Sequence, residues 1–232
     1  TTFSQKKPAY IIYNAKGKKV SYKKMLKSVS TKDIVLFGES HDNAISHWLE
    51  LELTKDLDAN NNLVLGAEMY EADNQSEINQ YLSGNIDYKA LDTLARLWSN
   101  DLTDYLPLLN YAKEVEIRFI ATNIPRKYAS MVYKQGFEAL DSLSTEEKAW
   151  IAPLPMHFDA NLPRYKNILA MMGEHGTPQL VMAQATKDAT MAHFILSNWT
   201  SGEQFIHYNG SYHSDYYEGI LWYLNLYNSE LD

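Results

Sequence analysis

Two short segments of the chain share a glycine that is followed three residues later by a histidine. They are Gly38-Glu-Ser-His41 and Gly210-Ser-Tyr-His213, and the first also carries the carboxylate of Glu39. In each segment the glycine permits a sharp turn, so that the polar side chains after it can project from a short loop. Taken alone, the first segment is better explained as a turn before a helix that Ser40 or Asp42 caps.

A glutamate elsewhere in the chain strengthens the case for a site. Glu68 directly follows an apolar run, where an unpaired buried carboxylate would cost several kcal/mol, so a partner such as His41 or a metal ion is expected. Two carboxylates and two imidazoles could bind a divalent metal ion, lower the pKa of its water and enable hydrolysis. The competing interpretation is a polar network of Glu–His pairs that satisfies buried groups. We favour the functional interpretation for the candidate catalytic and metal-binding set Glu39, His41, Glu68 and His213.

Other polar residues have simpler explanations. Asn123 follows another apolar run, and capping of the next helix is its expected role. Asp188 lies within a predicted helix, where it either pairs with Thr190 on the helix face or reaches the edge of the site. His47 and His193 lie on predicted helices with apolar neighbours, and we expect both to be ordinary surface or core histidines.

Alternating strands and helices must position these side chains. Short apolar runs predict buried strands, at residues 33–37, 63–67, 118–122, 179–182 and 204–208. Helical periodicity predicts helices, at residues 22–28, from 43 onward, and at 74–82, 88–98, 105–114 and 184–198. A small hairpin is expected at residues 10–22.

This alternation favours an α/β fold with a mostly parallel sheet flanked by helices. Ligands of such sheets bind beyond the carboxyl ends of the strands. Glu39, Glu68, Asn123 and His213 each follow a predicted strand, so parallel strands would bring all of them to one edge of the sheet.

The segment from 126 to 177 has a different character. It shows helical periods without a convincing strand, and Pro153, Pro155 and Pro163 divide it. We expect a smaller all-helical insertion or lid subdomain here, attached to an α/β core domain of residues 1–125 and 178–232.

Composition excludes several classes of function. The 232 residues carry a net charge of −8, which argues against a nucleic-acid partner because phosphate binding needs a basic face. The chain has no cysteine, which excludes disulfides and cysteine-based zinc sites. No run of 18 or more apolar residues occurs. The sequence starts at Thr1, and we expect that a targeting segment, with or without a lipid anchor, has been removed.

The motifs, taken in order, resemble those of the ChaN-like haem-binding proteins. That family is similar to a wider superfamily of Tiki-type metalloproteases and erythromycin-esterase-like proteins. The resemblance extends from about Asp33 to Gly219, with one departure: Tyr70 and Glu71 stand where an apolar aromatic residue is more usual. The segments that carry it are Phe37-Gly-Glu-Ser-His41, Glu68-Met69, Thr122-Asn123, Gln184 with Lys187-Asp-Ala-Thr-Met-Ala192, and Asn209-Gly-Ser-Tyr-His213.

The resemblance implies a haem-binding protein of bacterial iron or haem acquisition, placed in the cell envelope and often a lipoprotein. It implies an α/β domain with a smaller helical domain. It also implies a homodimer when loaded, in which haem binds as a cofacial pair with tyrosine ligation and a histidine from the partner subunit. The candidate haem-binding residues are Tyr165, Tyr212, His157 and His213.

Two alternatives to haem binding stay open. The protease relatives use a Gly-x-x-His and glutamate set with a divalent metal, which makes a metal-dependent hydrolase the second hypothesis. One carboxylate of the candidate set would then act as general base for metal-bound water. A protein that keeps the polar cluster only for stability, and works by interaction with a partner, is the third.

Overall fold

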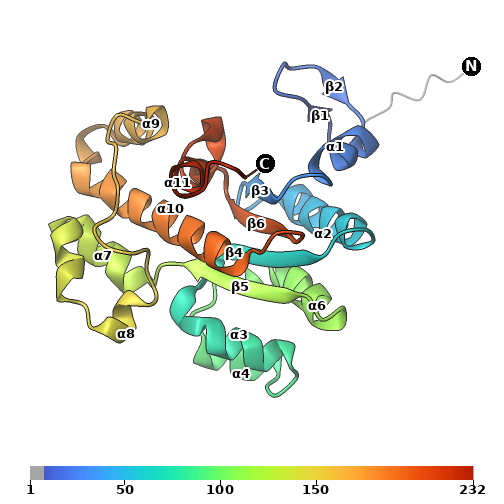
Figure 1. The fold of residues 1–232 in the computed structure, drawn as a ribbon, viewed down its shortest axis with the longest axis horizontal. Helices are drawn as coiled ribbons and strands as arrows, with labels where there is room; N and C mark the ends of the chain where they lie inside the picture. Colours follow the sequence, from blue (N-terminus) through green and yellow to red (C-terminus); the bar gives the residue numbers. More distant parts are fainter. Residues whose placement is uncertain (1–7, 232) are drawn as a thin grey trace, which may run out of the picture.

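The computed structural model describes residues 8–231 of the chain. Its centre is a four-stranded sheet of order β3-β6-β4-β5, in which every pairing is parallel. The strands are β3 (Ile34–Glu39), β4 (Leu63–Glu71), β5 (Arg118–Asn123) and β6 (Gln204–Gly210). The register pairs Glu39 with Gly210, so the carboxyl ends of β3 and β6 lie side by side. The predicted parallel α/β fold is confirmed (Figure 1).

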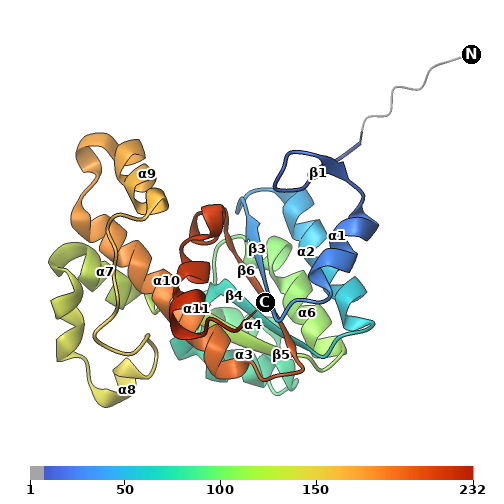
Figure 2. The ribbon, with the colours of Figure 1, turned by 45° about the horizontal axis from the view of Figure 1, so that its top comes forward.

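Helices cover both faces of the sheet because its strands alternate their apolar side chains between two cores. Leu65 and Ile206 point to one core, whereas Val64 and Phe205 point to the other. The first core is closed by α2 (Ala44–Asp58), α3 (Gln75–Leu82), α4 (Tyr88–Leu94) and α6 (Leu106–Glu114). The second is closed by α10 (Pro178–Asn198) and α11 (Ile220–Tyr227) (Figure 2).

The predicted strand at 179–182 is wrong. These residues form the first turns of α10, which begins after the Thr177 cap with Pro178 in its first turn. The Thr177 side chain accepts a hydrogen bond from the backbone N–H of Leu180, which is a strong start signal for a helix. A short apolar run is compatible with a buried helix as well as with a buried strand, and periodicity alone does not separate the two.

The segment from 126 to 177 is helical throughout its regular parts. It contains α7 (Arg126–Gln135), α8 (Thr145–Lys148) and α9 (Pro163–Met172). A 3₁₀ helix (Phe137–Ser142) joins α7 to α8, an irregular stretch leads from α8 to α9, and a 3₁₀ turn (Gly173–His175) follows α9. Helix α10 starts among these helices and ends over the sheet (Figure 2). Ala183 packs in the cluster of α7, and Ile195 packs against β6. The helical segment is therefore tied to the sheet through one continuous helix, and its separation as a subdomain stays a prediction.

Smaller elements complete the description. The hairpin of β1 (Ile12–Tyr13) and β2 (Lys19–Val20) precedes α1 (Tyr22–Val29), and α5 (Asp101–Asp104) precedes α6. Within residues 8–231, no helix combines the length and apolar character that crossing a bilayer requires.

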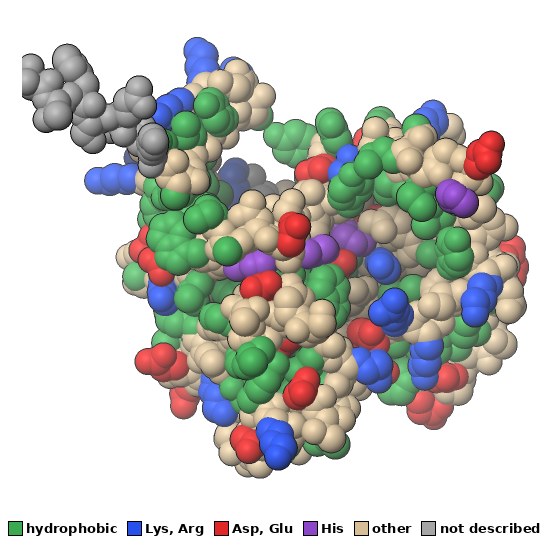
Figure 3. Space-filling model, turned by 180° about the vertical axis from the view of Figure 1, so that it is seen from behind, with side chains coloured by type: hydrophobic (Ala, Val, Ile, Leu, Met, Phe, Trp, Pro, Cys, Tyr) green, Lys and Arg blue, Asp and Glu red, His purple; other side chains and the backbone are tan. Residues whose placement is uncertain are grey.

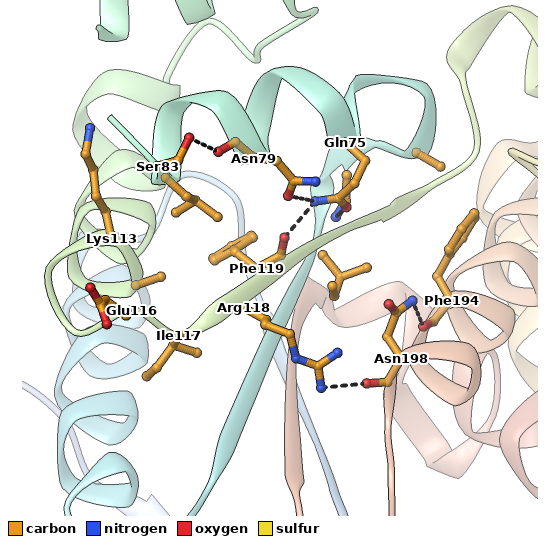
Figure 4. A pocket seen from close by; sticks show the side chains of 15 residues that line it. Gln75, Asn79, Ser83, Lys113, Glu116, Ile117, Arg118, Phe119, Phe194 and Asn198 are labelled. Carbon is orange, nitrogen blue, oxygen red and sulfur yellow. Dashed lines mark hydrogen bonds between the residues drawn. The ribbon is translucent and has the colours of Figure 1, made fainter. Parts of the chain in front are cut away.

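Strand β5 lies at one edge of the sheet, beside a hollow of about 640 Å³. The side-chain amide of Gln75 reaches across from α3 to this edge. Its Nε2 donates to the carbonyl of Phe119 at 2.9 Å, and its Oε1 accepts from the N–H of Ala121 at 2.6 Å (Figure 4). The amide thus takes the place that a peptide unit of a further strand would occupy.

Candidate functional site

The carboxyl ends of the strands open into a cleft of about 670 Å³. Glu39 and His41 reach it from the end of β3, Glu68 from β4, and His213 from the turn after β6. Helices α9 and α10 form the opposite wall. Figure 3 shows histidine side chains gathered along a hollow between two lobes of this surface. In the structure, these segments, which are distant in the sequence, lie at one edge of the sheet, as predicted.

One half of the site is built around the buried carboxylate of Glu39. Its Oε1 lies 2.7 Å from Nδ1 of His41 and accepts a hydrogen bond from the hydroxyl of Tyr105 at 2.8 Å. Its Oε2 lies 2.6 Å from Nε2 of His47. The hydrogen bond with Glu39 raises the pKa of His41, although partial burial opposes the charge. The ring of Trp98 packs edge-on against His41, with 4.7 Å between the ring centres.

The sequence analysis did not place three members of this half in the site. His47, expected to be a surface or core histidine, is buried, with its Nε2 2.6 Å from Oε2 of Glu39. Glu50 is fully buried beside Glu39, and burial together with the Glu39 charge raises its pKa well above the usual range. His47 and Glu50 are three residues apart on α2 and share one face, a spacing that could have revealed them. No feature of the sequence around Tyr105 indicates its contact with Glu39.

The other half of the site is built around His213, which is 4% exposed. Its Nε2 lies 3.1 Å from Oε1 of Glu68, and its Nδ1 lies 2.5 Å from Oδ1 of Asp188. Burial opposes the charge, but the two carboxylates raise the pKa of His213 to about 9. Burial would raise the pKa of Glu68, but His213 and the hydrogen bond from the N–H of Gly210 outweigh it and lower this pKa to about 2. Each ring nitrogen of His213 therefore faces a carboxylate.

The two halves meet across Gly210. A Cβ atom at this position would lie 2.6 Å from Nε2 of His41 and 3.5 Å from Oε2 of Glu68, so only a glycine leaves the imidazole its place. Among residues 8–231, no three His, Asp or Glu side chains are grouped so that they could hold a metal ion. The set predicted as metal ligands therefore consists of two separate acid–imidazole pairs, Glu39 with His41 and Glu68 with His213. Hydrolysis by the set stays a prediction.

The candidate haem-binding residues have different surroundings. Tyr212 lines the cleft and is 41% exposed. Its hydroxyl donates to Sδ of Met171 at 3.4 Å, and the guanidinium of Arg164 lies 3.7 Å from its ring centre. Tyr165, in contrast, is buried, and its hydroxyl donates to Oδ2 of Asp188 at 2.8 Å. His157 lines a separate hollow with His193, away from the cleft. Tyr165 and His157 are therefore not presented to a ligand in the cleft.

Two further expectations are settled by hydrogen bonds. Asn123 does not cap the next helix, because its Nδ2 donates to the carbonyl of Glu68 at 2.8 Å and Pro125 occupies the position before α7. Asp188 reaches the site rather than pairing on the helix surface with Thr190, since it is fully buried between His213 and Tyr165.

The cleft combines an apolar wall with a polar one. Helix α9 contributes Ile168, Met171 and Met172, while the facing turns contribute His41 and Tyr212. Sites for organic cofactors are commonly of this kind, with mostly apolar walls and a few placed polar groups. Of the two exposed groups, His41 has its Nδ1 held by a carboxylate, which is the usual arrangement behind a histidine that binds a metal through Nε2.

Comparison with known proteins bears on the same residues. The chain is 26% identical over 204 residues to Protein RETICULATA-RELATED 5, chloroplastic, of Arabidopsis thaliana. That match covers 81% of this chain and 27% of the relative, so the chain spans about a quarter of the length of the plant protein. Among solved structures, the fold is similar to that of ChaN of Campylobacter jejuni, described with cofacial haem binding. The TM-score is 0.70 at 18% identity, over 96% of this chain and 87% of that one.

A more distant likeness joins the chain to RRSP, a MARTX toxin effector domain from Vibrio vulnificus. The TM-score is 0.50 at 16% identity, over 87% of this chain and 32% of that one, and it concerns the fold alone. The family described as haem-binding uptake, Tiki superfamily, ChaN matches residues 25–224, which include both halves of the site. The chain therefore belongs to the ChaN family of haem-binding uptake proteins within the Tiki superfamily.

Proposed function

We propose that this protein binds haem in the cleft at the carboxyl edge of its sheet and takes part in bacterial haem or iron acquisition. The observation that carries the proposal is the make-up of the cleft, in which the apolar wall of α9 faces an exposed imidazole and an exposed phenol. We further propose that the protein works in the cell envelope, where acquisition takes place. Cell fractionation with an antibody to the chain tests that placement.

The residues of the cleft fit a porphyrin. Ile168, Met171 and Met172 offer apolar surface to a flat macrocycle, and the volume of about 670 Å³ is within the usual range for small-molecule sites. Bound haem would supply an iron that accepts nitrogen or oxygen ligands. The fit therefore depends on a free ligand atom in the wall that faces α9.

Two side chains can provide that atom. Within residues 8–231, the Tyr212 hydroxyl has the weak thioether acceptor of Met171 as its one hydrogen-bond partner, so it is easily released for iron. His41 uses Nδ1 for Glu39, and within residues 8–231 its Nε2 has no hydrogen-bond partner. We propose Tyr212 and His41 as the iron ligands. His213 is not proposed, because both of its nitrogens face carboxylates.

Titration of the purified protein with haemin, followed in the Soret region, tests the proposal. We expect a saturable change for the wild type, the loss of tyrosinate–iron charge-transfer bands in Tyr212→Phe, and an altered Soret maximum in His41→Ala. Removal of either ligand should weaken binding by about tenfold or more, because a metal–ligand bond and its orienting partner are lost. Exposed Tyr13 and His157, which lie outside the cleft, supply the controls Tyr13→Phe and His157→Ala. A wild type without a saturable Soret change would contradict the proposal.

We also propose that a second copy of the chain covers the mouth of the cleft when haem is bound. Three large apolar side chains of its lining are exposed, Met171, Met172 and Tyr212, and two more, Tyr216 and Tyr217, are exposed in the turn that follows His213. Tyr216 and Tyr217 are each 72% exposed and have φ values of 61° and 62°. This left-handed conformation costs about 1–2 kcal/mol for a residue with a Cβ, and such strain is often kept where a surface serves binding.

A further inference from the structure

Helix α10 brings one cation into the cleft that no carboxylate neutralises directly. Lys187 is half-buried and lines the cleft between the apolar residues of α9 and the Glu68–His213 pair. No acid in the described part of the chain forms an ion pair with its ammonium, whereas the other lysines and arginines with partners pair outside the cleft. An ammonium that is partly withdrawn from water and unpaired is unusual unless a ligand completes its environment.

The two buried carboxylates of the cleft have partners of their own, whereas Asp42, which also lines the cleft, is exposed and forms no ion pair within residues 8–231. Glu39 lies against His41 through Oε1 and against His47 through Oε2, although the second contact lacks hydrogen-bond geometry. Glu68 contacts His213 and accepts from the N–H of Gly210, so its two oxygens are occupied. The positive charge of Lys187 helps to lower the pKa of Glu68, but Lys187 donates no hydrogen bond to that carboxylate. Within residues 8–231 the Lys187 ammonium has no hydrogen-bond partner, so its three donor hydrogens are open to water or to a group that enters the cleft.

We propose that Lys187 binds a propionate carboxylate of the porphyrin and thereby makes the cleft selective for porphyrins with free acid side chains. This inference rests on the proposed haem binding and adds a residue and a selectivity to it. The apolar wall of α9 takes the macrocycle, and the ammonium on α10 holds the acid edge. Lys187 acts on the organic ligand and not on iron, so its effect is present with metal-free porphyrin too.

Metal-free protoporphyrin IX and its dimethyl ester distinguish binding of the macrocycle by the cleft from binding of its carboxylates by Lys187. Quenching of tryptophan fluorescence measures both. For the wild type we expect the diacid to bind at least about tenfold more tightly than the ester, as a charge-assisted hydrogen bond to a carboxylate allows. Lys187→Met should lose about tenfold with the diacid and change little with the ester. Lys187→Arg keeps the charge and should stay close to the wild type. Added salt should weaken diacid binding in the wild type more than in Lys187→Met.

The matched control is Lys166→Met, which removes an exposed lysine on α9 that does not line the cleft. Equal loss of both ligands in Lys187→Met would show a packing effect and overturn the inference, as would unchanged binding of the diacid. In both of those results the wild type still binds porphyrin, so the proposed function survives. A wild type that binds neither porphyrin nor haemin overturns the proposed function and this inference with it.

Discussion

At the scale of single residues, the site depends on charges that are buried but matched. His213 lies between Glu68 and Asp188, and each of the three is less than 5% exposed. The two carboxylates raise the pKa of His213 against the effect of burial, while burial raises the pKa of Asp188. Removal of one member of such a group leaves an uncompensated buried charge, which is far more costly than the net value of the pair. The glycine of the second Gly-x-x-His segment is equally tied to the site, because the His41 ring occupies the space where a Cβ would be.

The charge of His213 predicts a dependence of stability on pH. Folding raises the pKa of His213 from 6.5 to about 9, so its contribution is fully present below pH 6.5 and is lost as the pH rises through 9. Folding lowers the pKa of Glu68 from 4.5 to about 2, so its contribution is present above pH 4.5 and is lost as the pH falls towards 2. The free energy of unfolding should therefore be greatest between these two limits.

Urea unfolding at pH 6 and pH 9 measures this effect. We expect the wild type to lose up to about 3 kcal/mol over that interval, the value that corresponds to the change in the His213 pKa. His213→Gln should be less stable than the wild type at pH 6 and should lose most of this pH dependence. His157→Gln, which changes an exposed histidine, is the control. Equal stability of the wild type at both pH values would show that His213 is not charged in the fold.

Residue types and spacing predicted the site residues that follow strands and missed those that helix packing brings to the site. Glu39, His41, Glu68 and His213 follow strands, so the parallel topology alone brings them to one edge of the sheet. Tyr105 and Glu50 come from helices on one side of the sheet, and their contact with Glu39 depends on how those helices pack. Tyr165 and Tyr212 show the same limit, because sequence does not distinguish a buried phenol from an exposed one.

At the scale of elements, the strands and most helices follow from local patterns, and the exceptions have local causes. Predicted strand 63–67 continues to Glu71 through an irregular register with β5, which no periodicity indicates. Helix α10 is longer than predicted because the apolar run in its first turns is equally compatible with a buried strand. In both cases tertiary packing decides between conformations that the sequence leaves nearly equal.

The edge of β5 yields a prediction at this scale. Gln75→Ala removes the side-chain amide that pairs with the backbone of Phe119 and Ala121, and it leaves two backbone groups without a protein partner. We expect a loss of about 1–2 kcal/mol in the free energy of unfolding. Hydrogen exchange at the Ala121 amide should become faster than in the wild type. Gln80→Ala is the control, since the Gln80 side chain bonds only Ser76, at 3.5 Å. Unchanged exchange at Ala121 would contradict this account of the edge.

At the scale of the whole molecule, α10 joins the sheet to the helical segment and contributes side chains to the lining of the cleft between them. Its first half packs with α7 and α9, and its last turns cover the sheet. Its middle places Gln184 and Lys187 at the cleft and Asp188 behind His213. The two walls of the cleft thus belong to parts of the chain that one rigid helix holds together. This arrangement predicts a preformed cleft rather than one that assembles when a ligand arrives.

The exposed side chains around the cleft predict that haem changes the oligomeric state. Burial of Tyr216 and Tyr217 by a second copy would remove two large apolar side chains from water at once. Sedimentation velocity should detect a dimer with haemin, and a weaker dimer or none in the double variant Tyr216→Ser with Tyr217→Ser. Tyr13→Ser, which alters an exposed tyrosine of the hairpin, should dimerise like the wild type. A double variant that dimerises normally would move the interface to another surface.

The position of iron in a crystal of the haemin complex tests the central claim most directly. Anomalous scattering at the iron edge locates the metal without any assumption about the orientation of the porphyrin. We predict one strong peak per chain inside the cleft, next to His41 and Tyr212 and opposite Met171 and Met172. A peak in the hollow beside β5, or at another surface, would contradict the assignment of this cleft as the haem site.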